Sequence, residues 1–97
     1  PHALPFGTLS VNLIGSFIIG LLFALFMHTS AFSPTMKSFL TTGFLGGLTT
    51  YSTFALETFW LFNQGSLFLA LSNALLNVVG TILAAGSGYK IVNFLLK

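Results

Sequence analysis

Long apolar segments alternate with short polar segments along this chain. Residues 8–27, 36–62 and 67–89 are each apolar over about twenty residues or more, the length that an α-helix needs to cross the hydrocarbon core of a bilayer. Residues 28–35 and 63–66 lie between them and are rich in the residue types that end helices and form turns. The pattern predicts an all-α membrane protein in which three transmembrane helices form a single domain.

The segment 36–62 has an interior that is poorly suited to a continuous helix. Gly46 and Gly47 are adjacent and carry a high backbone-entropy cost, and four residues with hydroxyls that compete for backbone hydrogen bonds follow them. These four are Thr49, Thr50, Ser52 and Thr53. An unpaired backbone group in hydrocarbon costs several kcal/mol, so a broken helix is tolerated only where it faces protein, water or an ion. We therefore predict a break at mid-membrane that marks a functional site; the alternative is a continuous helix with a glycine-lined packing surface.

Polar residues inside the other two segments recur every four positions, so each set shares one face of a helix. The first set is Thr8, Asn12 and Ser16, continued by Gly20. The second set is Asn73, Asn77 and Thr81, continued by Ala85. Small residues at 80, 84 and 88 form a second face that would let another helix approach closely. Because a buried amide must find partners, these stripes predict either hydrogen bonds that hold helices together or the lining of a narrow polar path.

Charged residues are too rare for a soluble protein. They make up 4% of the chain, whereas soluble domains carry about 25%. Three crossings place Lys37, Lys90 and Lys97 on one side of the membrane and Glu57 toward the other, so the positive-inside rule assigns the lysine side to the cytoplasm. Three lysines are far too few for a nucleic-acid interface. The first apolar segment is too long for a signal peptide and has no basic lead-in, so we expect a membrane span there.

No pattern in the sequence points to an enzyme. Serine and histidine are present, but none is placed as a nucleophile beside a base. Glu57 is the only carboxylate side chain, which excludes paired-carboxylate chemistry and carboxylate metal sites within one chain, and there is no cysteine for a thiolate site. The glycines form no phosphate-binding loop with a lysine.

A path for ions is the chemistry that remains. An ion that crosses a membrane must have its hydration replaced by groups of the protein. Backbone carbonyls at the predicted break suit a hard cation such as sodium. Amides and hydroxyls suit a small, strongly hydrated anion, and so do the positive edges of aromatic rings, which make up 15% of the residues. Both kinds of ion stay open at this point.

Two ordered motifs resemble the signatures of a known family. Residues 7–20, with the sequence GTLSVNLIGSFIIG, look like its second-helix motif. Residues 43–54, GFLGGLTTYSTF, followed by Glu57, look like its third-helix motif. The family is the CrcB/Fluc fluoride ion channels, small membrane proteins that export toxic fluoride from microbial cells. The resemblance extends through the last helix and covers nearly the whole chain.

The resemblance implies a fluoride-selective channel in the plasma membrane, formed by an antiparallel, dual-topology dimer of this chain with itself or a paralogue. It implies two pores and a structural sodium ion at the dimer centre, held by backbone carbonyls of Gly46 and Thr49 from both subunits. By motif position, Asn12 lines a pore, Phe54 belongs to an aromatic box whose ring edges contact fluoride, and Glu57 is the acid of a vestibule. The other pore residues that it implies are Tyr51, Ser52, Thr53, Asn73, Asn77 and Thr81.

The chain departs from the family pattern in three places. The family has four helices, and its first, which ends with a basic residue, is absent from residues 1–97, so we expect a fragment or a sequence that begins late. Tyr51 stands where the family usually has the second phenylalanine of the box, and the polar track of the last helix usually carries a tyrosine and hydroxyl residues.

Two other functions stay open from the residues alone. One is a small drug/proton antiporter subunit, which needs a titrating carboxylate deep in the membrane, whereas Glu57 lies near a helix end. The other is a structural membrane subunit whose polar stripes only hold helices together.

Overall fold

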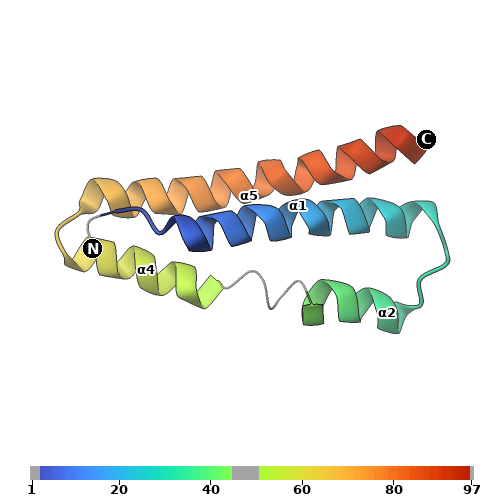
Figure 1. The fold of residues 1–97 in the computed structure, drawn as a ribbon, viewed down its shortest axis with the longest axis horizontal. Helices are drawn as coiled ribbons and strands as arrows, with labels where there is room; N and C mark the ends of the chain where they lie inside the picture. Colours follow the sequence, from blue (N-terminus) through green and yellow to red (C-terminus); the bar gives the residue numbers. More distant parts are fainter. Residues whose placement is uncertain (1–2, 45–50, 97) are drawn as a thin grey trace.

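The computed structural model describes residues 3–44 and 51–96, and every regular element in them is a helix, as the sequence predicts (Figure 1). The elements are α1 (Phe6–His28), α2 (Pro34–Ser38), the π-helix η1 (Phe39–Phe44), α4 (Tyr51–Asn63) and α5 (Leu67–Leu96). α1 and α5 run in the same direction and lie side by side for most of their length, and α4 packs mainly against α5.

Two of the described helices are long and apolar enough to cross a membrane. α1 has 23 residues and α5 has 30, which correspond to about 35 Å and 45 Å of helix. Only 28% of the apolar window of α1 and 17% of that of α5 are buried inside the chain. These helices are therefore unlike the core helix of a soluble protein, because most of their apolar surface faces outward to lipid or another chain.

Close backbone contact between α1 and α5 explains the glycines on their shared face. A β-carbon on Gly20 would overlap the carbonyl oxygen of Ala85, and one on Gly88 would overlap the carbonyl oxygen of Phe17. Small residues at these positions let two helices approach closely, as expected for helices packed in a membrane.

The polar track and the small residues of α5 lie on the same face, which differs from the sequence-based expectation of two faces. Asn73, Asn77 and Gly88 are all buried, and Asn77 and Gly88 both meet α1. Positions spaced by three, four, seven or eight residues fall within one broad stripe of a helix, so a four-residue spacing alone does not separate them.

Local sequence signals set the helix ends close to where the pattern predicts them. Ser33 caps α2 by accepting a hydrogen bond from the Met36 backbone nitrogen at 3.1 Å, and Pro34 follows at the first helical position. At the end of α4, Gly65 has a positive φ of 82°. The backbone nitrogen of Ser66 donates to the Leu61 carbonyl, and that of Gly65 donates to the Phe62 carbonyl, which is a Schellman motif.

The segment 36–62 is divided among α2, η1 and α4. The break that we predict at Gly46–Thr49 lies outside the described residues, so it stays a prediction, as does the count of three spans. Residues 39–44 form a π-helix that the sequence analysis did not predict. Thr41 donates its hydroxyl to the Lys37 carbonyl at 2.8 Å, the kind of competition for backbone oxygens that disturbs a helix.

The last helix continues beyond its predicted span of residues 67–89. It extends to Leu96. The residues after Tyr89 include no glycine or proline that would stop a helix earlier. His28, at the end of α1, forms a 2.8 Å hydrogen bond with Asn93 on this extension.

Candidate functional site

The interior of the described part of the chain is unusual because three amides are among its few buried side chains. Asn73 is 1% exposed, Asn77 4% and Asn12 8%. In the described residues, the buried hydrophobic side chains are Leu9, Ala24, Leu61 and Ala70. A buried amide without partners is costly, so the arrangement of hydrogen bonds around these three residues decides how the helices fit together.

A continuous series of hydrogen bonds joins the three amides across α1, α5 and α4. Asn12 Nδ2 donates to Asn77 Oδ1 at 2.8 Å. Asn77 Nδ2 lies 2.9 Å from the backbone oxygen of Asn73 and 3.1 Å from its Oδ1, and donates to both. Asn73 Nδ2 then donates to the hydroxyl of Thr58 at 2.8 Å, and Thr58 donates to the Phe54 carbonyl at 2.8 Å. We call this series the amide relay.

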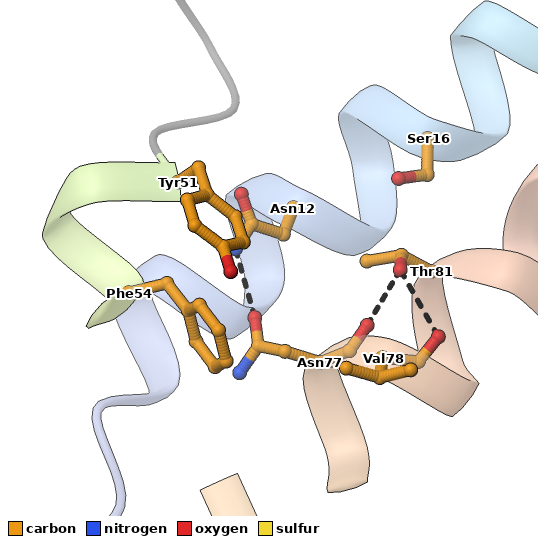
Figure 2. Close-up of a pocket in the computed structure, with 7 residues that line it drawn as sticks. All are labelled: Asn12, Ser16, Tyr51, Phe54, Asn77, Val78 and Thr81. Carbon is orange, nitrogen blue, oxygen red and sulfur yellow. Dashed lines mark hydrogen bonds between the residues drawn. The ribbon is translucent and has the colours of Figure 1, made fainter. Parts of the chain in front are cut away.

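The amide relay borders a cavity of about 210 Å³ between α1, α4 and α5. Asn12 and Ser16 reach it from α1, Tyr51 and Phe54 from α4, and the remaining lining residues from α5 (Figure 2). Those residues are Asn77, Val78 and Thr81. None of the seven carries a charge.

Two aromatic rings of α4 point into this cavity toward the amides (Figure 2). The ring centroids of Tyr51 and Phe54 lie 5.6 Å apart, with an angle of 56° between the ring planes. In the part of the chain that the structure describes, no hydrogen-bond partner accompanies the Tyr51 hydroxyl. The positively polarised groups of the lining thus include ring edges, the hydroxyls of Tyr51 and Ser16, and the second amide N–H of Asn12.

The structure brings together five of the residues that the sequence predicts for the pore: Asn12, Tyr51, Phe54, Asn77 and Thr81. Thr81 lines the cavity, but its hydroxyl hydrogen points to its own helix. The hydroxyl donates to the backbone oxygens of Asn77 at 2.5 Å and Val78 at 3.3 Å. In this rotamer Thr81 offers the cavity a methyl group and oxygen lone pairs, with no hydrogen-bond donor.

Two other predicted pore residues are not in the cavity lining, and a third has a side chain that the structure does not describe. Asn73 lies behind it, fully buried in the amide relay. Thr53 is exposed on α4 and does not line the cavity, and the side chain of Ser52 lies outside what the structure describes. The role of each of these three residues in a pore stays a prediction.

Glu57 lines a separate cavity of about 210 Å³ with Ala3, Pro5, Leu56, Trp60 and Leu61. Its Oε1 atom is buried, with no hydrogen-bond partner among the residues that the structure describes. This cavity lies by the start of α1 and the final turns of α4, whereas Lys37 of α2 and Lys90 of α5 lie toward the opposite end of the molecule (Figure 1). The predicted separation of these charges is therefore present in the fold.

The two residues predicted to hold sodium, Gly46 and Thr49, lie outside the described residues. Sequence reasoning also missed two residues of the site. Val78 lines the cavity, and Thr58 ends the amide relay. Thr58 lies one turn after Phe54 on the helix face that meets α5, and that four-residue spacing is the signal in the sequence that could have identified it.

Comparison with known proteins gives a consistent result. A family model described as CrcB-like protein, Camphor Resistance (CrcB), matches residues 1–89. A fluoride-specific ion channel FluC of Sulfurimonas denitrificans is 58% identical over 97 residues, which are 100% of this chain and 75% of that protein. A second FluC, of Nautilia profundicola, is 49% identical over 96 residues, 99% of this chain and 75% of that protein.

A FluC protein of Methanocaldococcus jannaschii is also similar, with 54% identity over 83 residues that cover 82% of this chain and 64% of that protein. The matched residues include the segments around Asn12 and Phe54 from which the cavity is built. The family model covers most of the chain and the first two relatives align with nearly all of it, so this chain belongs to the CrcB family.

Proposed function

We propose that this chain forms a fluoride-selective ion channel through which fluoride leaves the cell. The main support is the cavity between α1, α4 and α5, where amides, hydroxyls and aromatic rings meet without a charged side chain. A small anion needs donors that replace its water, and it must also be able to leave. Amide and hydroxyl dipoles and ring edges can replace the water around the anion. They do so without the tight binding that a lysine or arginine would add.

The working unit that we propose is an antiparallel dimer of this chain with itself or a paralogue. Tyr51 is 79% exposed although it lines the cavity, so one chain alone leaves the cavity open on the tyrosine side. The molecule is also thin, with extents of 50 × 26 × 14 Å, and many large apolar side chains face outward. A second copy would cover this side of the cavity and exclude lipid from it.

A structural sodium ion at the dimer centre belongs to the same proposal. The groups that would hold it are backbone carbonyls of Gly46 and Thr49, which lie between the end of η1 at Phe44 and the start of α4 at Tyr51. Carbonyl oxygens are the type of ligand that hard cations take, and no charged side chain is needed. The ion would neutralise backbone oxygens and so stabilise the assembly.

Fluoride efflux from liposomes tests the channel directly. Purified protein is reconstituted with fluoride inside the vesicles, and external fluoride is followed with an electrode after an ionophore sets the membrane potential. We expect electrogenic fluoride efflux and no comparable efflux of chloride, with protein-free vesicles as the control. A flux that requires a proton gradient would indicate an antiporter, and a folded dimer that passes no fluoride would contradict the proposal.

A further inference from the structure

The amide relay has a direction, and the direction matters for an anion. A side-chain amide has one acceptor end and one donor end, and a flip exchanges them. Asn12 meets Asn77 with its donor end. If the Asn12 amide were flipped, its oxygen would take the place of its NH₂ group and would repel fluoride. The atoms that hold the amides in one orientation therefore decide whether the cavity attracts an anion.

The direction is fixed at two backbone oxygens, since a carbonyl can only accept. At the end of the relay, Thr58 uses its single hydroxyl hydrogen on the Phe54 carbonyl, so its oxygen is left to accept from Asn73. Asn73 must then turn its NH₂ group to Thr58 and its Oδ1 to Asn77. The backbone oxygen of Asn73 accepts from Asn77 in the same sense, so the Asn73 side chain supplies one of two bonds that orient this amide, and its loss should weaken the orientation without abolishing it.

Each amide transmits this orientation to the next. Because Asn77 commits its NH₂ group to Asn73, only its oxygen is available to α1, and Asn12 must approach it with a donor. Asn12 thereby keeps one N–H on Asn77, and the same nitrogen, on a side chain that lines the cavity, carries a second N–H that can donate to an anion. Neither Asn73 nor Thr58 lines that cavity.

We propose that Asn73 and Thr58 are positioning residues that hold the Asn12 amide in its donor-forward orientation for fluoride. This inference rests on the proposed function, because it assigns a role in anion recognition to residues outside the cavity. It replaces the expectation that Asn73 itself touches the ion. The competing interpretation is that both residues only attach α4 to α5, in which case their removal changes stability and leaves the properties of Asn12 unchanged.

The test compares Thr58→Val with Thr58→Ser. Valine keeps the shape of threonine and removes the hydroxyl that ends the relay, whereas serine keeps the hydroxyl. We expect Thr58→Val to lower fluoride flux per folded protein by roughly fivefold, which corresponds to a hydrogen bond of about 1 kcal/mol. Thr58→Ser should retain the wild-type flux. Thr41→Val is the matched control, because Thr41 also donates to a backbone oxygen but no described amide donates to it.

A second measurement separates orientation from stability. Side-chain ¹⁵N–¹H signals of the asparagines are recorded in micelles during a fluoride titration, with Asn12 assigned by substitution. In the wild type, we expect one Asn12 N–H to shift with fluoride. Thr58→Val and Asn73→Leu should each weaken that shift, and the double variant should lose no more than Asn73→Leu alone, since both substitutions break one series of bonds.

The outcomes distinguish failure of this inference from failure of the proposed function. If the wild type conducts fluoride and Asn12 responds to it equally in Thr58→Val and Asn73→Leu, the positioning role is refuted and the two residues only hold helices together. If the wild-type Asn12 signals do not respond and no fluoride flux occurs, the proposed function itself is wrong.

Discussion

Asn12 connects the packing of the chain to its chemistry, because one amide serves both. Its Nδ2 donates to Asn77 and links α1 to α5, and the same side chain lines the cavity beside Tyr51 and Phe54 (Figure 2). A substitution at this residue therefore changes two properties at once. The effect on helix packing and the effect on the cavity can be separated only by variants that change one and keep the other.

Asn12→Asp should reduce fluoride flux more strongly than Asn12→Ser. The aspartate places a carboxylate oxygen against Asn77 Oδ1, so two acceptors face each other, and it adds a negative charge beside an anion path. The serine is shorter but retains one donor. We expect at least a tenfold loss for the aspartate, about 1.4 kcal/mol of barrier, and a smaller loss for the serine in liposome efflux. Equal fluxes for the two variants, with dimers intact, would assign Asn12 to packing alone.

The pair of rings on α4 makes a second prediction at this scale. Phe54 can offer only its ring edge, whereas Tyr51 offers an edge and a hydroxyl. If the edges matter, Tyr51→Phe should conserve flux and Phe54→Ile should abolish it, because isoleucine fills the volume without a polarised ring. The measurement is fluoride efflux from liposomes with each single variant. A loss of more than roughly tenfold in Tyr51→Phe would instead assign the donor role to the hydroxyl, and wild-type flux in Phe54→Ile would refute a role of the aromatic ring.

At the scale of helices, the contact between α1 and α5 can be tested with glycines of the same helix. A β-carbon on Gly88 would overlap the Phe17 carbonyl, whereas one on Gly86 would meet nothing within 4 Å. Gly88→Ala should therefore destabilise the fold by about 1–3 kcal/mol, as overpacking does. Gly86→Ala should be neutral or stabilise it by up to about 1 kcal/mol through helix propensity. Unfolding in mixed detergent micelles measures both, and equal stabilities would show that the helices separate easily at Gly88.

The helices themselves could be predicted from the sequence because apolar length and turn residues determine them locally. Residues 8–27 and 67–89 correspond to α1 and most of α5, and the turn at 63–66 has the positive φ that Gly65 allows. The amide stripes could be predicted as faces for the same reason. A repeat of four residues fixes which positions share a face, and Asn12 and Asn77 do meet across that face.

The partners of each polar group could not be predicted, because periodicity gives no information about the opposite helix. Asn73 does not line the cavity, and its amide is bound to Thr58. Thr81 reaches the cavity, but its hydroxyl is bound to its own helix. The π-helix of residues 39–44 was missed because it depends on how hydroxyls and backbone oxygens compete locally, and composition does not record the outcome of that competition.

At the scale of the whole molecule, the open cavity and the exposed apolar surface support the proposal that the working unit contains more than one chain. The cavity opens at Tyr51, and most of the apolar surface of α1 and α5 faces outward. Lipid could cover that apolar surface, but lipid tails against the amide cavity would leave its donors without partners. A second chain would supply both apolar contact and polar partners, which is the physical reason to expect a dimer.

An antiparallel dimer would expose each end of the chain on both sides of the membrane, and this can be tested with single introduced cysteines. The sequence contains no cysteine, so a single introduced cysteine reports on one position without background. Ser30 is exposed in the connection between α1 and α2, and Asn63 is exposed at the end of α4, toward the opposite end of the molecule (Figure 1). In an antiparallel dimer, each position faces both sides of the membrane, once in each subunit.

We therefore expect a membrane-impermeant maleimide, added to intact cells, to label about half of the cysteines in Ser30→Cys and also about half in Asn63→Cys. The remainder should react only after the membrane is opened with detergent, which is the control for buried or oxidised thiols. A chain with one fixed orientation would give a different result, because one variant would be labelled fully from outside and the other not at all. That pattern would exclude dual topology in the cell, and the weak charge asymmetry between Glu57 and the lysines would then be enough to orient every subunit in the same way.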